Sequence, residues 1–287
     1  MKRFVVIFFV AAVLTLASAN MSSMLEIQWQ SNFTRPESRV IEGTEAAEGQ
    51  FPYQVRISIV GAIIIMGWCG GMIIAPNWVL TAAHCVKGDF PIFLLDYIVF
   101  YIEAGSVEAN DPEQDTHALW LNAHAHPEYS STTLFNDIGL LKTDKAFDFT
   151  SPNVKPIALV ARGTPIGSLV GLDITVSGFG ATANGGSISP VLRFAVLKVI
   201  SFVECQGQYV GDTLPPMSIC AQDKIAPISA VCSGDSGGPA TYYSGGKLRA
   251  YGVISYATDQ GCDVAAQGFT YIALYIPWIE TVTGLHF

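Results

Sequence analysis

The sequence predicts an all-β protein with two halves and one short helix near its C-terminal end. Residues 57 to 84 contain no charged side chain and are rich in β-branched residues, which is typical of buried strands. Glycine and proline interrupt this run repeatedly, so strands explain it better than a membrane-spanning helix. Short apolar segments separated by glycine turns continue as far as residue 271. Residues 275 to 282 have the character of a closing helix.

The composition limits the function. The chain has 287 residues, and half of them are hydrophobic, which is enough for one large or two medium cores. Only 14% are charged, the formal net charge is −9, and no run of lysine or arginine occurs. A row of phosphates would find no cations to neutralise it, so we expect no nucleic-acid binding. The excess of acidic residues needs no special function, because a net charge keeps a protein soluble.

The N-terminus has the pattern of a secretory signal. Lys2 and Arg3 precede an apolar run from residue 4 to 16, and small residues follow at 17 to 19. This pattern predicts a signal peptide over residues 1–19. The apolar run is too short to span a membrane, and the residues on either side of it are those of a signal peptide and not of a membrane anchor. We therefore expect a secreted, extracellular protein that is not held in a membrane.

The cysteines and histidines do not indicate a metal. In a secreted chain, the six cysteines predict a disulfide framework, although their spacing does not fix the pairing. His124 and His126 are the histidines closest in sequence, and we expect them on a surface loop. His117 and His286 are also expected on the surface. The acidic segment 108–115 could bind calcium, but ordinary solvation explains it better.

The segment Cys232-Ser-Gly-Asp-Ser-Gly-Gly-Pro239 carries the strongest chemical signal. Its glycines permit tight turns and a close approach of a substrate backbone. If Ser236 is a nucleophile, the N–H groups of Gly234 and Ser236 can stabilise an oxyanion. Asp235 is a charge in an apolar neighbourhood and requires a cationic partner. By itself such a run is more often a turn, so the rest of the chain decides its meaning.

A serine nucleophile requires a base and a group that orients the base. The segments Leu80-Thr-Ala-Ala-His-Cys85 and Phe135-Asn-Asp-Ile-Gly-Leu-Leu141 supply a histidine and an aspartate. Together with residues 234–239, they resemble the three signature segments of the trypsin/chymotrypsin family of serine endopeptidases. The resemblance extends from residue 40 to the C-terminus. It implies a catalytic triad of His84, Asp137 and Ser236.

The resemblance also implies the architecture. The family's catalytic domain would occupy residues 40–287, as two six-stranded antiparallel Greek-key β-barrels and a C-terminal helix. We expect the N-terminal barrel at about 40–155 and the C-terminal barrel at about 156–287. Over residues 151–164 proline recurs and the strand pattern is less regular, which is typical of a connection between domains and agrees with that boundary. Neither half repeats the other in sequence, so the two barrels rest on the resemblance.

The resemblance selects one disulfide pairing. It implies the bridges Cys69–Cys85, Cys205–Cys220 and Cys232–Cys262. The first would tie the strand at residues 70–71 to the residue after His84. The third would tie the nucleophile loop to the segment that follows Ser255. Both bridges would keep catalytic groups in register.

The resemblance further implies a zymogen. Arg39 is followed by Val40-Ile-Glu-Gly43, which is similar to the family's mature N-terminus. In the family, cleavage frees an α-amine that pairs with the aspartate before the nucleophile, here Asp235. Residues 20–39 would then be an activation propeptide, and without a cysteine nothing covalent would retain it. Both sequons of the chain lie in this segment, at Asn20 and Asn32.

Selectivity is expected from a pocket for the side chain before the scissile bond. Trypsin-like members carry an aspartate six residues before the nucleophile, where this chain has Ala230, followed by Val231. By the same resemblance, Ala257 and Gly268 would form the walls of the pocket. A buried cation without a partner costs several kcal/mol, so trypsin-like selectivity is disfavoured. We expect a preference for large apolar or aromatic residues, and elastase-like selectivity for small aliphatic residues stays open.

The substrate and partners follow from the same resemblance. Ser255-Tyr256-Ala257 resembles the strand whose backbone pairs with the bound peptide. We expect a monomer that hydrolyses proteins or peptides without a cofactor, together with an activating trypsin-like protease and proteinaceous inhibitors. Digestion is the default role, and a cascade or toxin role and an inactive binding homologue are the alternatives. The apolar segment 61–67 is either an exposed contact surface or tucked under a neighbouring loop.

Overall fold

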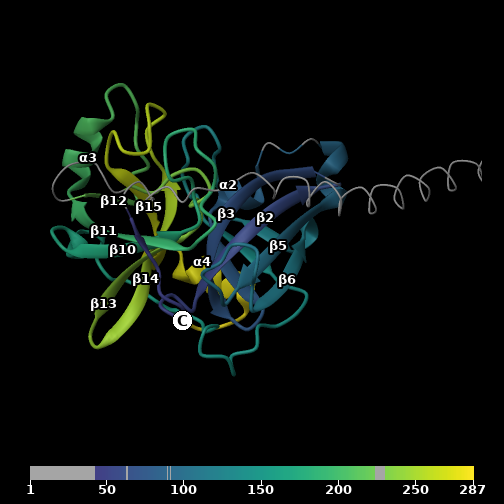
Figure 1. Cartoon of the computed structure of the whole chain (residues 1–287). Coiled ribbons are helices and arrows are strands. Elements are labelled where there is room, and N and C mark those ends of the chain that lie inside the picture. Colours follow the sequence, from purple (N-terminus) through teal and green to yellow (C-terminus); the bar gives the residue numbers. More distant parts are fainter. Residues whose placement is uncertain (1–42, 63, 89, 91, 224–229) are drawn as a thin grey trace, which may run out of the picture. The chain divides into compact units, whose positions relative to one another are not determined.

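The computed structural model describes residues 43–62, 64–88, 90, 92–223 and 230–287, and these all belong to one compact unit. The signal peptide, the propeptide, Arg39 and Val40 lie outside the described residues. The described chain is mostly β and forms two sheets, one from each half of the sequence (Figure 1). This confirms the predicted trypsin-like fold class.

The first sheet has seven antiparallel strands in the order β6-β5-β2-β3-β4-β8-β7. The strands are β2 (Gln54–Gly61), β3 (Ile64–Ala75), β4 (Trp78–Thr81), β5 (Ile98–Ala104), β6 (Gln114–Leu119), β7 (Ala123–Ala125) and β8 (Gly139–Lys142). Among the described strands, the end strands β6 and β7 do not pair with each other. The first half is therefore a curled half-barrel, whereas the sequence led us to expect a closed one.

The second sheet closes on itself. Its strands are β1 (Thr44–Glu45), β9 (Ala158–Leu159), β10 (Asp173–Gly178), β11 (Arg193–Ile200), β12 (Ser218–Gln222), β13 (Pro239–Ser244), β14 (Lys247–Tyr256) and β15 (Gln267–Tyr271). Because β11 pairs with both β10 and β12, the strands β10 to β15 form a closed barrel. The short strand β1 pairs with β11, so Thr44 and Glu45 belong to the second sheet and not to the first half.

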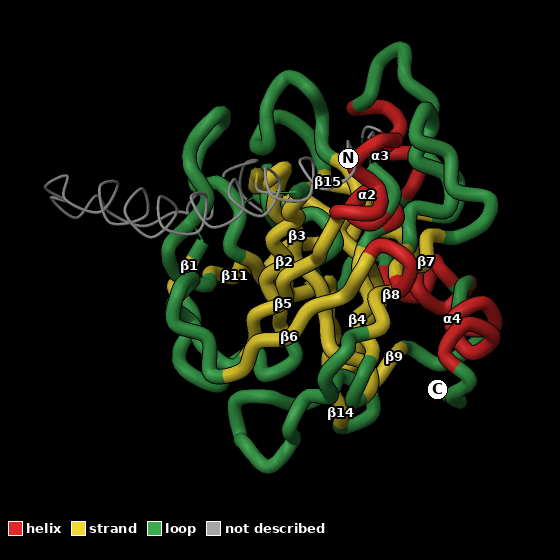
Figure 2. Tube along the Cα trace, turned by 90° about the vertical axis from the view of Figure 1, so that its right-hand side faces the viewer, coloured by secondary structure: helices red, strands yellow, loops and turns green. Residues whose placement is uncertain are grey.

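Short helices connect the strands, and one closes the chain. They are α2 (Ala83–Val86), α3 (Phe202–Gln208), α4 (Ile276–Thr283), η1 (Ile92–Tyr97), η2 (Trp120–Asn122), η3 (Ile166–Leu169) and η4 (Ile272–Leu274). Helix α4 confirms the predicted closing helix. Proline in its first turn and Gly284 in the left-handed conformation after it define its ends. It lies beside β7 and β8 (Figure 2), where the ring of Trp278 packs against that of His126 at an interplanar angle of 56°.

One apolar core links the two sheets. The charge-free run of the sequence forms most of β2, β3 and β4, and its Ile57, Ile73 and Leu80 are fully buried. They belong to the same cluster as Val253 and Phe269 of the second sheet. Such a shared core fixes the relation between the sheets, because close-packed interiors resist shear. No helix among the described residues is long and apolar enough to cross a membrane.

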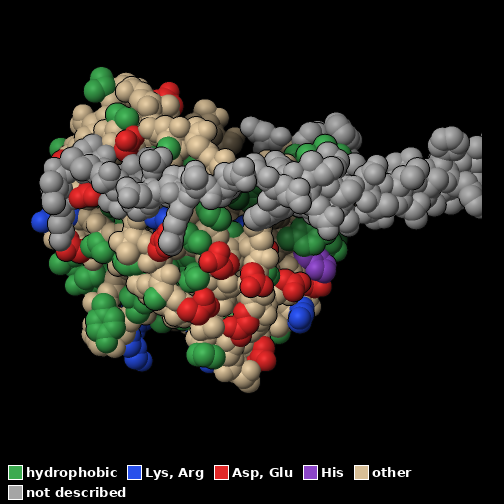
Figure 3. Space-filling view, in the orientation of Figure 1, with side chains coloured by type: hydrophobic (Ala, Val, Ile, Leu, Met, Phe, Trp, Pro, Cys, Tyr) green, Lys and Arg blue, Asp and Glu red, His purple; other side chains and the backbone are tan. Residues whose placement is uncertain are grey.

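Two expectations about the surface can be judged. The prediction of a surface loop is wrong for His124, because β7 includes this residue. His126 follows β7 in a loop, and both rings are half-buried against aromatic side chains. At the tip of the β2–β3 hairpin, Ile64 and Ile65 are 65% and 51% exposed. Their exposure favours the contact-surface interpretation of this segment over a buried loop. Acidic side chains predominate over basic ones on the face in Figure 3, in keeping with the net charge of −9.

Candidate active site

Neighbouring strands of the first sheet bring His84 and Asp137 together. His84 lies in α2, directly after β4, and Asp137 lies directly before β8. Strands β4 and β8 pair with each other, with Thr81 opposite Gly139. The end of β4 that leads to His84 therefore lies next to the start of β8, which Asp137 precedes. His84 Nδ1 lies 2.8 Å from Asp137 Oδ2, and the backbone N–H of His84 donates to Asp137 Oδ1 at 2.9 Å. The second contact fixes the Asp137 carboxylate relative to the backbone of His84.

The second sheet holds Asp137 from the other side. Ser255 Oγ, near the end of β14, donates to Asp137 Oδ2 at 2.6 Å. Thr270 Oγ1 in β15 donates to the backbone carbonyl of Asp137 at 2.8 Å. The carboxylate is fully buried, and a buried charge is tolerated only with such hydrogen bonds. The site therefore lies where the two sheets meet.

The electrostatics suit a histidine that accepts a proton. Burial opposes the charged imidazolium, but the Asp137 carboxylate and its hydrogen bond outweigh burial and raise the pKa of His84 above its ordinary value. With Nδ1 occupied by Asp137, the ring presents Nε2 to solvent and substrate. This arrangement is the one in which an imidazole can work as a general base.

The loop that carries Ser236 is fixed by backbone contacts to both sheets. The carbonyl of Ser236 accepts from the N–H of Gly70 at 2.8 Å, and the N–H of Gly237 donates to the carbonyl of Ile254 at 2.8 Å. Gly237 has φ of +83°, and a Cβ there would lie 2.1 Å from Thr81 Oγ1, so only glycine fits. The backbone of the loop therefore packs directly against the first sheet.

Two N–H groups of this loop are available for a ligand. Within the described part of the chain, the backbone N–H groups of Gly234 and Ser236 donate to no protein acceptor. Gly234 has φ of +97°, a left-handed conformation that a glycine adopts without strain. Free N–H groups beside a serine are what an oxyanion hole requires.

The structure confirms all three predicted disulfides. They are Cys69–Cys85, Cys205–Cys220 and Cys232–Cys262. Cys85 Sγ lies 3.5 Å from the carbonyl oxygen of Ser236, so the first bridge lies directly under the nucleophile loop. Among the described residues, the one group with metal-ligand proximity is His84 with the two cysteines of this bridge. Bonded sulfurs are not thiolates, so this group is not a metal site.

Asp235 is buried next to the candidate nucleophile. Its carboxylate accepts from the backbone N–H groups of Gly180 at 2.7 Å and Cys232 at 2.9 Å. Burial raises its pKa to about 6, although the two hydrogen bonds oppose the shift. Among the described residues no lysine, arginine or histidine forms an ion pair with it. The carboxylate is therefore positioned for a cation from elsewhere.

The residues predicted for the selectivity pocket are apolar and largely enclosed. Ala230 and Val231 are buried, and Ala257 is half-buried after the end of β14. Gly268 faces the ring of Tyr256, because a Cβ at this glycine would lie 2.0 Å from that ring. The space that the glycine leaves is thus filled by Tyr256, an outcome that strand spacing alone does not reveal.

Sequence reasoning missed a polar residue next to the predicted pocket and one contact of the predicted Ser255. Gln267 is 1% exposed, and its Nε2 donates to the carbonyls of Cys262 and Ala265 at 3.3 Å. Its Oε1 has no partner among the described residues. It directly precedes Gly268, so counting along the strand could have found it. The contact of Ser255 with Asp137 spans 118 residues and had no local signal.

The acidic segment expected on the surface is held by a cation of the chain. Arg56 donates to the carbonyl of Ala109 and to Asn110 Oδ1, and lies 3.4 Å from Glu103. This guanidinium links β2 to the segment 108–115 through two neutral acceptors, and its ion pair is with Glu103 of β5. Ordinary solvation of the segment, in preference to calcium binding, stays a prediction.

Comparison with known proteins agrees with this geometry. The family model described as Trypsin matches residues 40–279. Collagenase of Hypoderma lineatum is 28% identical over 99% of this chain and 100% of its own length. Trypsin-1 of Astacus astacus is 31% identical over 84% of this chain and 98% of its own. Chymotrypsin-like elastase family member 1 of Homo sapiens is 30% identical over 90% and 98%.

A solved structure shows the same architecture. HL collagenase superposes with a TM-score of 0.72 and 27% sequence identity, covering 85% of this chain and 99% of that one. The family match includes the histidine, aspartate and serine segments described above. The chain belongs to the trypsin family and is a serine-type endopeptidase.

Proposed function

We propose that the protein is a secreted endopeptidase, made as a zymogen, that cleaves after apolar or aromatic residues. His84, Asp137 and Ser236 form its triad. The observation that carries the proposal is the fixed contact of His84 Nδ1 with the buried Asp137. Sγ of the adjacent Cys85 lies 3.5 Å from the carbonyl oxygen of Ser236, in a loop that has free N–H groups. Comparable arrangements catalyse acyl transfer in unrelated folds, so the chemistry follows from geometry.

The mechanism is acyl transfer through a covalent intermediate. Ser236 Oγ attacks the peptide carbonyl while His84 Nε2 accepts its proton, and the oxyanion binds the N–H groups of Gly234 and Ser236. His84 then gives the proton to the leaving amine, and the acyl-enzyme forms. A water molecule, deprotonated by His84, attacks the ester and releases the acid and Ser236. Asp137 orients the imidazole and stabilises its cation throughout.

Apolar selectivity is supported by the absence, among the described residues of the predicted pocket, of a carboxylate that could pair with a cation. Ala230 takes the place of an acid, and Val231 beside it is apolar. Asp263, which follows Cys262, is engaged by the side-chain amide of Asn184 at 2.8 Å. A lysine or arginine side chain entering this pocket would lose its hydration, and none of the described pocket residues would supply a carboxylate in return.

Elastase-like selectivity for small aliphatic residues is the second candidate. The similarity to Chymotrypsin-like elastase family member 1 of Homo sapiens supports it. The Val231 and Ala257 side chains, which narrow the pocket, and the Tyr256 ring, which fills the space at Gly268, support it as well. The decisive experiment is cleavage of a peptide library by the activated enzyme. Fastest cleavage after phenylalanine, tyrosine or leucine is expected, and a maximum at alanine would indicate the elastase-like alternative. A maximum at lysine or arginine would contradict the apolar pocket. In that library Ala230→Asp should add cleavage after basic residues.

Activation should require a second protease. The cleavage site presents Arg39 to a pocket with Ala230 at its base, so this enzyme should process itself poorly. A desolvation penalty of about 3 kcal/mol slows self-cleavage by more than roughly a hundredfold. Purified precursor alone should stay uncleaved, whereas trace trypsin should release an active form that begins Val40-Ile-Glu-Gly. Rapid processing of the precursor alone, with trypsin contamination excluded by a selective inhibitor, would overturn both the pocket and the activation scheme.

A further inference from the structure

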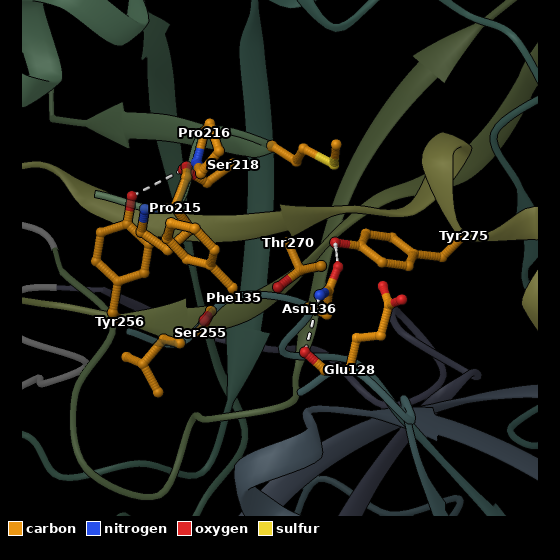
Figure 4. Close-up of a pocket in the computed structure, with 12 residues that line it drawn as sticks. Glu128, Phe135, Asn136, Pro215, Pro216, Ser218, Ser255, Tyr256, Thr270 and Tyr275 are labelled. Atoms are coloured by element: carbon orange, nitrogen blue, oxygen red, sulfur yellow. Dashed lines mark hydrogen bonds between the residues drawn. The ribbon is translucent and has the colours of Figure 1, made fainter. Parts of the chain in front are cut away.

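A cavity of about 320 Å³ lies directly beside the catalytic aspartate. Ser255 and Thr270 line it, and both side chains donate hydrogen bonds to Asp137. Figure 4 shows Tyr256 and two prolines on one side of the cavity, with Glu128, Asn136 and Tyr275 on the other. The catalytic residues proposed above do not use this space.

The Tyr256 side of the cavity is apolar. Leu134 and Met217 line it together with Tyr256, Pro215 and Pro216. Leu134 has φ of +54°, a conformation that a leucine rarely adopts and that its surroundings must enforce. Tyr256 is fixed as well, because its hydroxyl lies 2.9 Å from Ser218 Oγ. These walls are suited to an extended aliphatic chain.

The opposite side carries a carboxylate. The backbone of Glu128 is fixed by Asn136, whose Nδ2 donates to its carbonyl at 2.9 Å, and Tyr275 donates to Asn136 Oδ1 at 3.0 Å. Among the described residues, the Glu128 carboxylate itself has no hydrogen bond or ion pair. It points toward Tyr275 (Figure 4). Burial, with the charges of Asp137 and Glu128, raises the pKa of Tyr275 to about 12, so that hydroxyl stays neutral.

The charge of the cavity is negative. No lysine or arginine lines its described part. The ring of His126 packs against Tyr275, and burial lowers its pKa, so it supplies no cation at neutral pH. A side chain that combines an aliphatic stem with a cationic end, as lysine and arginine do, matches both halves of such a cavity.

We propose that this cavity is a substrate subsite for a lysine or arginine side chain, two to four residues before the scissile bond. The aliphatic stem would lie on Leu134 and Tyr256, and the cationic end would meet Glu128. The inference rests on the proposed function, because a peptide paired with residues 255–257 would pass the cavity where Ser255 and Tyr256 line it. The enzyme would then combine an apolar residue at the bond with a basic residue upstream.

The test compares matched peptides with phenylalanine before the bond. Lysine or its uncharged counterpart norleucine stands two, three or four residues before the bond, and kcat/KM is measured for each. We expect wild-type enzyme to favour lysine about 2- to 5-fold at one of these positions, the range for a partly exposed ion pair. Glu128→Gln should reduce that ratio to about 1, and Glu128→Lys should invert it. Glu48→Gln, at an exposed glutamate that lines no part of the cavity, should keep the wild-type ratio.

Salt provides a measurement that needs no variant. Added salt should lower the lysine preference of the wild-type enzyme and leave norleucine peptides unaffected, because salt screens partly exposed charges. Equal ratios for wild type and Glu128→Gln, or a ratio insensitive to salt, would overturn the proposal. Binding of the same peptides to Ser236→Ala separates the two claims. Lysine preference in binding without wild-type turnover would refute the proposed function and keep the subsite, whereas turnover without the preference would refute the subsite alone.

Discussion

The catalytic cluster and the surfaces that would contact substrate are constructed in opposite ways. Asp137 is fully buried and receives hydrogen bonds from the His84 backbone, the His84 ring and Ser255. At the tip of the β2–β3 hairpin, Ile64 is 65% exposed to solvent. Buried polar networks lose heavily when one member is removed, whereas exposed apolar side chains lose little. The chemistry should therefore respond to substitution by orders of magnitude, and the selectivity by a few-fold.

Ser236→Ala should produce the largest effect. Loss of the nucleophile removes the covalent route, so turnover should fall on the order of 10⁴-fold or more, while peptide binding and folding remain. Ser244→Ala, at a half-buried serine in the β13–β14 hairpin, serves as the control and should keep normal turnover. A Ser236→Ala enzyme that retained about a tenth of wild-type turnover would show that another group is the nucleophile.

Asp137→Asn should lower kcat by about 10³- to 10⁴-fold, because the imidazole would lose its orienting acceptor. It should also move the acid limb of the kcat/KM profile. Asp137 raises the pKa of His84 in the wild type, so its neutralisation lowers that pKa and shifts the limb to lower pH. An acid limb that stays in place would mean that a group other than His84 is the base.

Asp235 should make the precursor less stable than the mature enzyme above its pKa. Burial raises that pKa to about 6 from its ordinary value of 3.8. A raised acid pKa gives stability at low pH that is lost as pH rises through about 6. The loss is about 3 kcal/mol, unless the Val40 amine pairs with the carboxylate. Cleavage should therefore raise Tm by several degrees more at pH 8 than at pH 4, and calorimetry of both forms measures this. An equal rise at both pH values would argue against the ion pair.

The smallest effect should come from the exposed hairpin. The hairpin borders the leaving-group side in the resembled fold, so Ile64→Ser with Ile65→Ser should weaken apolar preference after the scissile bond by a few-fold. Preference before the bond should be unchanged. The readout is the cleavage profile of the double variant against the wild type, and identical profiles would show that the hairpin does not bind substrate.

Much of the fold was predictable because its signals are local. The charge-free run with glycine breaks predicted buried strands, and it forms most of β2, β3 and β4. The three signature segments implied the disulfides, which the structure contains. Closure of the second barrel was implied by the resemblance and not by local signals, because pairing of β11 with β12 depends on how the whole sheet twists.

Contacts across long stretches of sequence escaped prediction. Ser255 reaches Asp137 over 118 residues, and the cavity forms only where Glu128, Pro215 and Tyr275 converge. Tyr256 fills the space at Gly268 because β14 and β15 pair with an irregular register next to that residue. Side-chain periodicity gives the face on which a residue lies, and not its distant partners.

Labelling of the nucleophile tests the central claim most directly. A serine-directed organophosphorus reagent should modify Ser236, located by mass spectrometry, in the form that begins at Val40. The precursor and His84→Ala should react far more slowly, because one lacks the ordered site and the other lacks the base. Label on another residue, or equal labelling of Ser236 in the precursor and the cleaved form, would contradict the account of a zymogen whose triad is His84, Asp137 and Ser236.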